Sequence, residues 1–295
     1  MLAPALLSQG RARYERVMHG WVDNLHEDAL THTVSLTDDD RGLEVAIVAL
    51  PSPSYAIVEA KLTPLAGAVA PSVATGFARL AGAALVGGLT RQVAGLVGEA
   101  PGGALAVDAS IEVGRLARQV AKMPRAQAER AASGDPLECW RLDTTGWVEL
   151  PNSCFAYSEA GRNLFGTRTV AAQMNPDLYS PRPGQRKVFE RRKVARLERV
   201  NDGRLRLFHS MHDNVHGFEI TYEIDLATGK IVRAEHVTPR LPYMGICSEP
   251  QRRIASLLGE TVDAGLRKRI QTTIGGESGC GQLYDLTSDL LKLLA

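Results

Sequence analysis

The sequence contains little cysteine and almost no net charge. Its 295 residues include four cysteines, which are too few and too widely spaced for a disulfide scaffold and predict a reducing, cytoplasmic compartment. The 34 basic residues balance 33 acidic ones, so the chain lacks the basic excess that binds nucleic acid or an anionic membrane surface. We therefore expect no nucleic-acid partner and no membrane partner.

Segments that target or anchor a protein are also missing from the pattern. Residues 1–10 lack the basic start of a secretory signal and are too short for one. The most apolar stretch, residues 79–91, falls well short of the ~20 residues that a membrane span needs. Hydrophobic residues make up 44% and charged residues 23%, which is ordinary globular composition and excludes a disordered or fibrous chain.

The short motifs of several enzyme classes are absent as well. The sequence has no GxSxG, no HExxH and no P-loop lysine. A glycine-rich run at residues 275–279 follows a predicted helix, whereas a phosphate-binding loop leads from a strand into a helix. Any catalytic or binding site must therefore be formed by residues that do not follow one of these motifs.

What the sequence does contain is a long internal repeat. Several short runs and an aspartate recur at an offset of 175 residues, and the agreement continues at an offset of 177. The sequence predicts two copies of one domain, residues 1–123 and 186–295, joined by an unduplicated segment over residues 124–185. The matching pairs include Tyr14-Glu15-Arg16 with Phe189-Glu190-Arg191, Asp38 with Asp213, Leu43-Glu44-Val45 with Phe218-Glu219-Ile220, and Asp108 with Asp285.

Each copy is predicted to be an α+β unit. In the second copy, four runs rich in β-formers are separated by turn residues, and three runs with apolar residues at helical spacing follow. We expect two repeats of a four-stranded antiparallel sheet followed by three helices, paired as one pseudo-symmetric unit. The predicted strands are residues 188–200, 204–211, 218–225 and 230–237, and the predicted helices are residues 249–259, 262–274 and 282–294.

The connecting segment differs in character from both copies. Residues 124–135 are charged and rich in alanine, which indicates a linker helix, and an irregular, aromatic-rich stretch follows. This stretch is either a loop that covers the seam between domains or an aromatic wall and lid for a flat ligand. Its aromatic residues include Trp140, Trp147, Phe155, Tyr157, Phe165 and Tyr179.

Reactive side chains are concentrated in the second copy. Of five such residues, only an aspartate has an identical counterpart in the first copy. We therefore expect the functional site to lie in the second copy. The five residues are His212, Asp213, His216, Cys247 and Cys280, and their counterparts are Thr37, Asp38, Arg41, Ser72 and Gly103.

Histidines cluster beside this aspartate. His209, His212 and His216 surround Asp213 at the end of a predicted strand, and a histidine held by a carboxylate can transfer a proton near neutral pH. This pattern favours general acid–base catalysis. Further candidates follow the last predicted strand, where an arginine and a tyrosine can hold a phenolate or carboxylate. The predicted catalytic residues are His212, Asp213, His216, Arg240 and Tyr243, and the predicted substrate contacts are Trp140, Trp147, Cys247 and Cys280.

The two cysteines of the second copy allow another interpretation. Cys247 and Cys280 each precede a predicted helix, where the helix dipole favours a thiolate. Together with His216 and Asp213 they would form a mixed ligand set of the kind that zinc or iron accepts, although no CxxC pair is present. Two small buried thiols are the simpler explanation. Both interpretations stay open.

Three runs in the second copy resemble a bacterial family that is catalogued as a domain of unknown function. In that family a His-Asp-Met strand, a Pro-Tyr-Pro-Ile-Cys run and a Gly-Cys-Thr-His-Leu helix start recur in this order. The resemblance covers residues 188–294 and, more faintly, residues 14–117. Gly281-Gln282 replaces the family's Thr-His, which argues against a metal ligand at that position. The three runs are residues 216–225, 242–247 and 279–283.

A duplicated protein of this kind also resembles the formaldehyde-releasing lyases of the phenylcoumaran γ-formaldehyde lyase group. That resemblance implies a cofactor-independent cleavage of a carbon–carbon bond, by general acid–base catalysis, that converts a lignin-derived β-5 phenolic dimer into a stilbene. The expected partner is an aromatic small molecule, and a homodimer is a further possibility. The order of strands and helices, with two loop cysteines, also resembles NifU-type iron–sulfur scaffolds. A metal- or iron–sulfur-binding protein without catalysis is therefore the alternative.

Overall fold

The computed structural model of the chain describes residues 5–7, 11–172 and 174–294, so the predicted absence of a signal at residues 1–10 falls mostly outside it. Four strands and three helices come first, a connecting segment follows, and four more strands lead into the last helices. The strands are β1 (Arg13–Asn24), β2 (Leu30–Asp38), β3 (Gly42–Ala49), β4 (Ile57–Ala66), β5 (Gln185–Asn201), β6 (Arg204–Asp213), β7 (Gly217–Asp225) and β8 (Ile231–Arg240). The α-helices are α1 (Pro71–Ala78), α2 (Leu89–Val97), α3 (Gly103–Leu116), α4 (Arg125–Ala131), α5 (Pro136–Gly146), α6 (Glu159–Asn163), α7 (Leu266–Ile274) and α8 (Gly281–Leu291), and the 3₁₀ helices are η1 (Ala5–Leu7), η2 (Phe155–Tyr157), η3 (Leu164–Gly166), η4 (Pro176–Leu178) and η5 (Pro250–Leu257).

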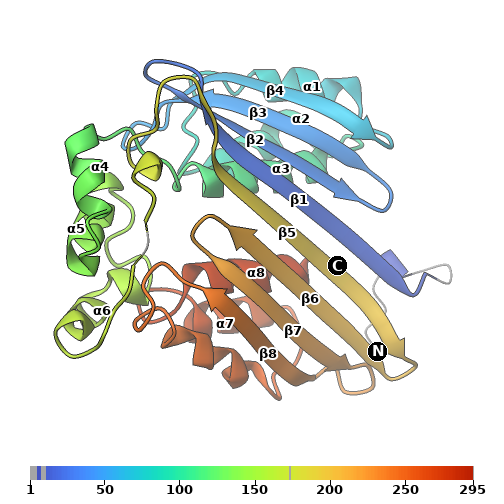
Figure 1. Cartoon of the computed structure of the whole chain (residues 1–295). Helices are drawn as coiled ribbons and strands as arrows, with labels where there is room; N and C mark the ends of the chain where they lie inside the picture. The colour runs from blue at the N-terminus through green and yellow to red at the C-terminus, as the bar shows by residue number, and fades with distance from the viewer. Residues whose placement is uncertain (1–4, 8–10, 173, 295) are drawn as a thin grey trace.

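All eight strands form one antiparallel sheet. Its order is β4-β3-β2-β1-β5-β6-β7-β8, so the first strands of the two halves meet at the centre and the last strands lie at the edges. β1 and β5 pair along most of their length, with Met18 opposite Lys193. In Figure 1 the helices α1–α3 lie behind the strands of the first half, and α7 and α8 lie behind those of the second. The helices of both halves thus cover the same face of the sheet.

Alternation along the strands decides which side chains meet the helices. On β6, every second side chain from Leu205 to Asp213 is buried, and those between them are half-buried. The buried side chains form two apolar cores, one beneath each half of the sheet. The connecting segment contributes to both cores, with Trp147 in the first and Cys139 in the second. It therefore lies at the seam between the halves.

The α+β class is confirmed, and so are the predicted strands of the second half. Their ends differ from the predicted ones by at most three residues. The helices agree less well. The first is the 3₁₀ helix η5, and the second begins at Leu266 because residues 259–262 run beside the edge strand, where the N–H of Ile231 donates to the carbonyl of Glu260 (2.9 Å).

The connecting segment is more regular than predicted. α4 is the expected linker helix, but the stretch predicted to be irregular contains α5 and α6, so that part of the prediction was wrong. α5 forms because Asp135 accepts a hydrogen bond from the N–H of Leu137 and Pro136 occupies the first turn. In Figure 1 this segment (green) lies at the side of the sheet where β6 turns into β7. Among the described helices, none is both long and apolar enough to cross a membrane.

Candidate functional site

The turn between β6 and β7 fixes one histidine against one aspartate. The Oδ1 atom of Asp213 accepts the backbone N–H groups of Val215 (2.7 Å) and His216 (2.5 Å). The same carboxylate lies 3.2 and 3.3 Å from Nδ1 of His216. A carboxylate only accepts hydrogen bonds, so Nδ1 carries the proton and, in the neutral ring, Nε2 is left as the acceptor. The turn thus presents His216 in the tautomer that a general base needs.

A buried arginine holds the aspartate in place. Arg191 of β5 lies opposite Asp213 in the sheet, and its Nε and Nη2 atoms lie 2.8 and 2.7 Å from Oδ2. Both side chains are fully buried. Burial by itself raises the pKa of Asp213, but the charges of Arg191 and His216 outweigh burial and hold this pKa well below its usual range. Asp213 therefore stays ionised and orients His216.

A second buried carboxylate, Asp143 of α5, faces the same region. Its Oδ1 accepts the hydroxyl of Tyr179 (2.5 Å), and its Oδ2 accepts the hydroxyls of Tyr157 (2.8 Å) and Tyr243. Burial raises the pKa of Asp143, although the three hydroxyls partly offset this rise. The charge of a protonated His216 also lowers the pKa of Asp143, so the two groups are within electrostatic reach.

His216, Asp143, Tyr157 and Tyr179 line one pocket of about 100 Å³. His216 and Val215 reach it from the second half, Arg118 and Gln119 from the residues just after α3, and the rest of its wall comes largely from the connecting segment. The pocket is somewhat smaller than the ~150 Å³ cavity that admits benzene in an engineered protein, so an aromatic ring enters only if side chains at its mouth move. The aromatic and ionisable side chains of its wall are Arg118, Asp143, Trp147, Tyr157, Tyr179 and His216.

The structure brings some of the predicted residues into this pocket. His216 and Trp147 line it, and Trp147 packs edge-on against Tyr179 with the ring centroids 5.6 Å apart. Tyr243 lies directly behind it, hydrogen-bonded to Asp143. One of the two predicted tryptophans thus forms part of the aromatic wall that the sequence suggested.

Other predicted residues lie elsewhere. Strand alternation places His212 on the face of the sheet opposite to Asp213, where its Nε2 lies 3.4 Å from Glu219. Arg240 is exposed and donates to the backbone carbonyl of His216 (3.3 Å), so it supports the turn from outside. Trp140 packs on Phe165, and its Nε1 donates to the carbonyl of Ala156 (2.8 Å).

The two predicted cysteine ligands are buried or partly buried thiols. Cys280 is the N-cap of α8, and its Sγ accepts the N–H of Leu283 (3.5 Å). Burial raises the pKa of Cys280 and that of Cys247, so the expectation of a thiolate is wrong: desolvation outweighs the helix dipole. Over the described residues, no group of three or more His, Cys, Asp or Glu side chains is arranged to hold a metal ion.

Two central residues of this site were not predicted from the sequence. Asp143 lies four residues after Cys139 and one after Leu142, and all three are buried on α5. An acidic residue on the apolar face of a helix is the sequence signal that could have identified Asp143. Arg191 stands at an inward position of β5 between Phe189 and Lys193. A charge at an inward strand position indicates a buried ion pair.

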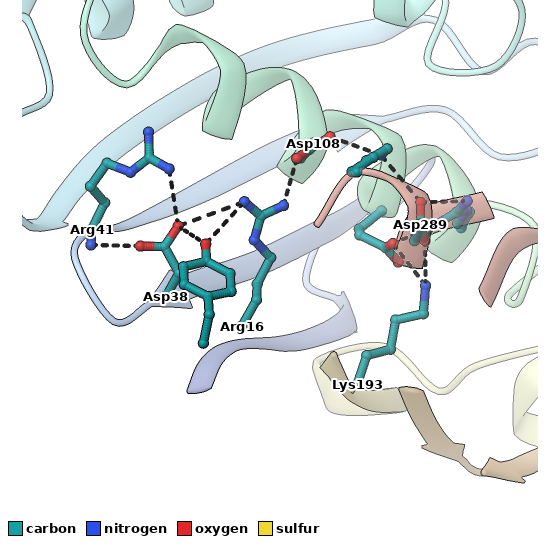
Figure 2. A network of polar contacts seen from close by, with 10 residues as sticks. Arg16, Asp38, Arg41, Asp108, Lys193 and Asp289 are labelled. Atoms are coloured by element: carbon teal, nitrogen blue, oxygen red, sulfur yellow. Dashed lines mark hydrogen bonds and ion pairs between the residues drawn. The ribbon is translucent and has the colours of Figure 1, made fainter. Parts of the chain in front are cut away.

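The first half has a similar turn, in which the aspartate contacts arginines. Between β2 and β3, Asp38 accepts the hydroxyl of Tyr14 (2.7 Å) and lies 3.2 Å from Arg41 and 3.6 Å from Arg16. Figure 2 shows Arg16 between Asp38 and Asp108, to which it is bound at 2.7 Å. Arginine therefore takes the position at this turn that His216 takes in the second half.

An ion network joins the two halves beneath the centre of the sheet. α3 carries two acids and one base, and α8 carries two acids and is followed by Lys292 at its C-cap. Each base pairs with at least one acid of the opposite helix. Lys193 of β5 lies between Glu112 of α3 (2.8 Å) and Asp289 of α8 (3.4 Å) (Figure 2). We call this group the central ion network; it comprises Asp108, Glu112, Arg115, Lys193, Asp285, Asp289 and Lys292.

Comparison with known proteins gives a family for part of the chain. No curated protein matches it significantly. Residues 198–294, which include β6–β8, η5, α7 and α8, match the model of a family described as "Protein of unknown function (DUF2889)". This part of the chain, which carries Asp213 and His216, thus corresponds to a domain-of-unknown-function family.

Proposed function

We propose that the protein is an enzyme that performs acid–base chemistry on an aromatic small molecule in the pocket between His216 and Asp143. One observation carries this proposal: a histidine held by a buried ion pair and a separate buried carboxylate open onto one pocket with aromatic walls. Pockets with a few convergent ionisable groups among aromatic side chains are typical of enzyme sites.

The two carboxylates of the site suit different roles. Arg191 keeps Asp213 ionised, so this carboxylate orients the histidine and does not exchange protons itself. Asp143 is buried in an environment that raises its pKa, and such a carboxylate can exchange a proton closer to neutral pH. We assign His216 as the general base and Asp143 as the group that returns or accepts the second proton.

The resemblance to formaldehyde-releasing lyases suggests a specific reaction. A phenolic proton leaves to a base, the ring-ether C–O bond breaks, and its oxygen is protonated, giving a quinone methide. Loss of the γ-hydroxyl proton then breaks the Cβ–Cγ bond and releases formaldehyde, and the electron pair forms the stilbene double bond and restores the phenolate. No electrons are gained or lost overall. The scheme removes two protons from the substrate and returns two, to the ether oxygen and finally to the phenolate. We assign these transfers to His216 and Asp143, and Trp147, Tyr157 and Tyr179 supply aromatic contacts.

We further propose that the two halves arose by duplication, and the pairing registers support this. Arg16 lies opposite Asp38, as Arg191 lies opposite Asp213. At the same offset of 175 residues, Met18 and Lys193 are counterparts, and they face each other where β1 meets β5, as a twofold axis requires. The reciprocal ion pairs of α3 and α8 have the same symmetry.

The experiment that tests the reaction uses the purified chain and a phenolic β-5 dimer bearing the γ-hydroxymethyl group. We expect formaldehyde and stilbene to form in equal amounts without an added cofactor. Zinc and iron are measured in the same preparation, because turnover that depends on stoichiometric metal would support the metal-binding alternative. If the dimer is bound but not cleaved, the proposed binding site is supported and the proposed reaction is contradicted.

A further inference from the structure

Besides side-chain contacts such as that of Tyr243 with Asp143, backbone hydrogen bonds join the connecting segment to the second half. The N–H of Phe155 donates to the carbonyl of Gly279 (2.8 Å), and Ala171 and Met244 exchange two hydrogen bonds (3.1 and 2.9 Å). The first contact lies just before helix η2, which contains Tyr157, a residue of the pocket wall. A change at the contact between Phe155 and Gly279 would therefore affect the position of Tyr157 in the pocket wall.

Two cysteines flank the first contact. Cys154 precedes Phe155 and Cys280 follows Gly279, and both have extended backbone angles. One hydrogen bond of 2.8 Å between the adjoining residues limits the separation of their Cα atoms to about 8 Å at most. A disulfide needs about 4.4–6.8 Å between these atoms, a range that lies within this limit.

The environment of the two sulfurs agrees with this placement. Both are free thiols, and both side chains are partly buried against the second core. After burial, the charge of Cys280 is the main influence that raises the pKa of Cys154 to about 11. The charge of Cys154 likewise raises the pKa of Cys247, so the three thiols are within electrostatic reach of one another. Cys247 is more deeply buried, in the same core.

We propose that Cys154 and Cys280 form an oxidation site, at which glutathione disulfide or a similar small disulfide cross-links the connecting segment to the start of α8. One cysteine thiolate attacks the small disulfide and releases one thiol. The second cysteine then attacks the mixed disulfide and releases the other thiol. Both cysteines lose a proton and are oxidised, and the small disulfide is reduced to two thiols. This site goes beyond the proposed function and does not rest on it.

The cross-link would fasten the segment that carries Asp143, Trp147 and Tyr157 to the second half. Because the attacking species is the thiolate and burial keeps both groups protonated, the reaction should be slow at neutral pH. Its rate should rise with pH, by about tenfold per unit while the thiol predominates. The closed loop spans more than a hundred residues, so the thermal midpoint should rise by several degrees.

The test treats the full chain with glutathione disulfide and follows its intact mass under denaturing conditions. We expect a loss of about 2 Da, a cross-linked peptide that joins Cys154 to Cys280, and slower amide exchange at residues 154–160. Cys154→Ser and Cys280→Ser should each abolish the mass loss. Cys280→Ser keeps a hydroxyl that can cap α8, so its fold should be retained.

Cys139→Ser is the matched control, because Cys139 is also a buried thiol of the connecting segment but contacts Tyr179 and Tyr243 on the other side. This variant should still be cross-linked. A chain that keeps its mass at pH 8.5 after prolonged treatment, or a cross-link that uses Cys247 or Cys139, would overturn the proposal. These readouts do not depend on turnover, so their failure is distinct from failure of the proposed reaction.

Discussion

The two strand turns of this protein share a scaffold and differ in what surrounds it. At each turn an aspartate accepts two backbone N–H groups and faces an arginine on the neighbouring central strand. In the first half a second arginine, Arg41, completes the ion pair and is one-third exposed (36%). In the second half His216 takes that place, 13% exposed, and the connecting segment adds Asp143 and Trp147 opposite it. A shared scaffold thus becomes a candidate site through one histidine and one covering segment.

The largest expected difference between the two turns is in turnover. His216→Ala should lower kcat for the phenolic dimer by ~10²–10⁴-fold, because it removes the assigned base. Arg41→Ala, the same truncation at the counterpart position, should leave kcat within about twofold. Circular dichroism on both variants checks that they are folded. Equal losses in the two variants would mean that the turns contribute to stability alone.

The second largest difference between the two turns should be in their contribution to the free energy of unfolding. Asp213→Ala leaves Arg191 fully buried without its carboxylate, which should cost about 3–5 kcal/mol of unfolding free energy. Asp38→Ala leaves Arg16, which is 17% exposed and still bound to Asp108, so its loss should be only about 1–2 kcal/mol. Urea denaturation measures both. If Asp38→Ala proved the more damaging change, the buried ion pair would not be the stronger support.

Acid sensitivity should follow the same order. The folded-state pKa of Asp213 is depressed, so its stabilising contribution is complete above its unfolded pKa of ~3.9 and is lost as pH falls below that value. The pKa of Asp38 is also lowered, but by less. Between about pH 5 and 2, Asp213→Asn should therefore flatten the pH dependence of the unfolding free energy more than Asp38→Asn does. An unchanged slope in Asp213→Asn would show that other carboxylates govern acid unfolding.

The smallest effect is expected at the central ion network. Lys193→Met copies the residue that its counterpart Met18 provides, and Arg115 still pairs with both acids, so the loss should be about 1–2 kcal/mol. Adding Glu112→Leu should restore stability to within about 1 kcal/mol of the original protein, because an apolar pair replaces a buried ionic one. A double variant less stable than Lys193→Met alone would contradict this.

The sequence predicted the strands well because their signals are local. Turn residues such as Asn201-Asp202-Gly203 and the alternation along β6 act within a few positions of each other. The connecting segment was predicted less well, because dispersed aromatic residues and prolines concealed the helical spacing of α5.

The candidate site was only partly predictable for a related reason. His216 and Asp213 were found because they are three residues apart, and Tyr243 because it precedes a cysteine. The contact of Tyr243 with Asp143 joins positions one hundred residues apart and depends on how α5 packs at the seam between the halves. His212 shows the converse: nearness in sequence placed it beside Asp213, but strand alternation turns it to the other face.

The most direct test of the central claim is to ask where a small phenol binds. In an NMR titration of the full chain with 2-methoxyphenol, we expect shifts in the amides of Val215, His216 and Gln282 and in the indole N–H of Trp147. His216→Ala should weaken these shifts. Amide shifts confined to residues 38–42 of the first-half turn, or no saturable shifts near His216, would contradict the assignment of the site to the second half.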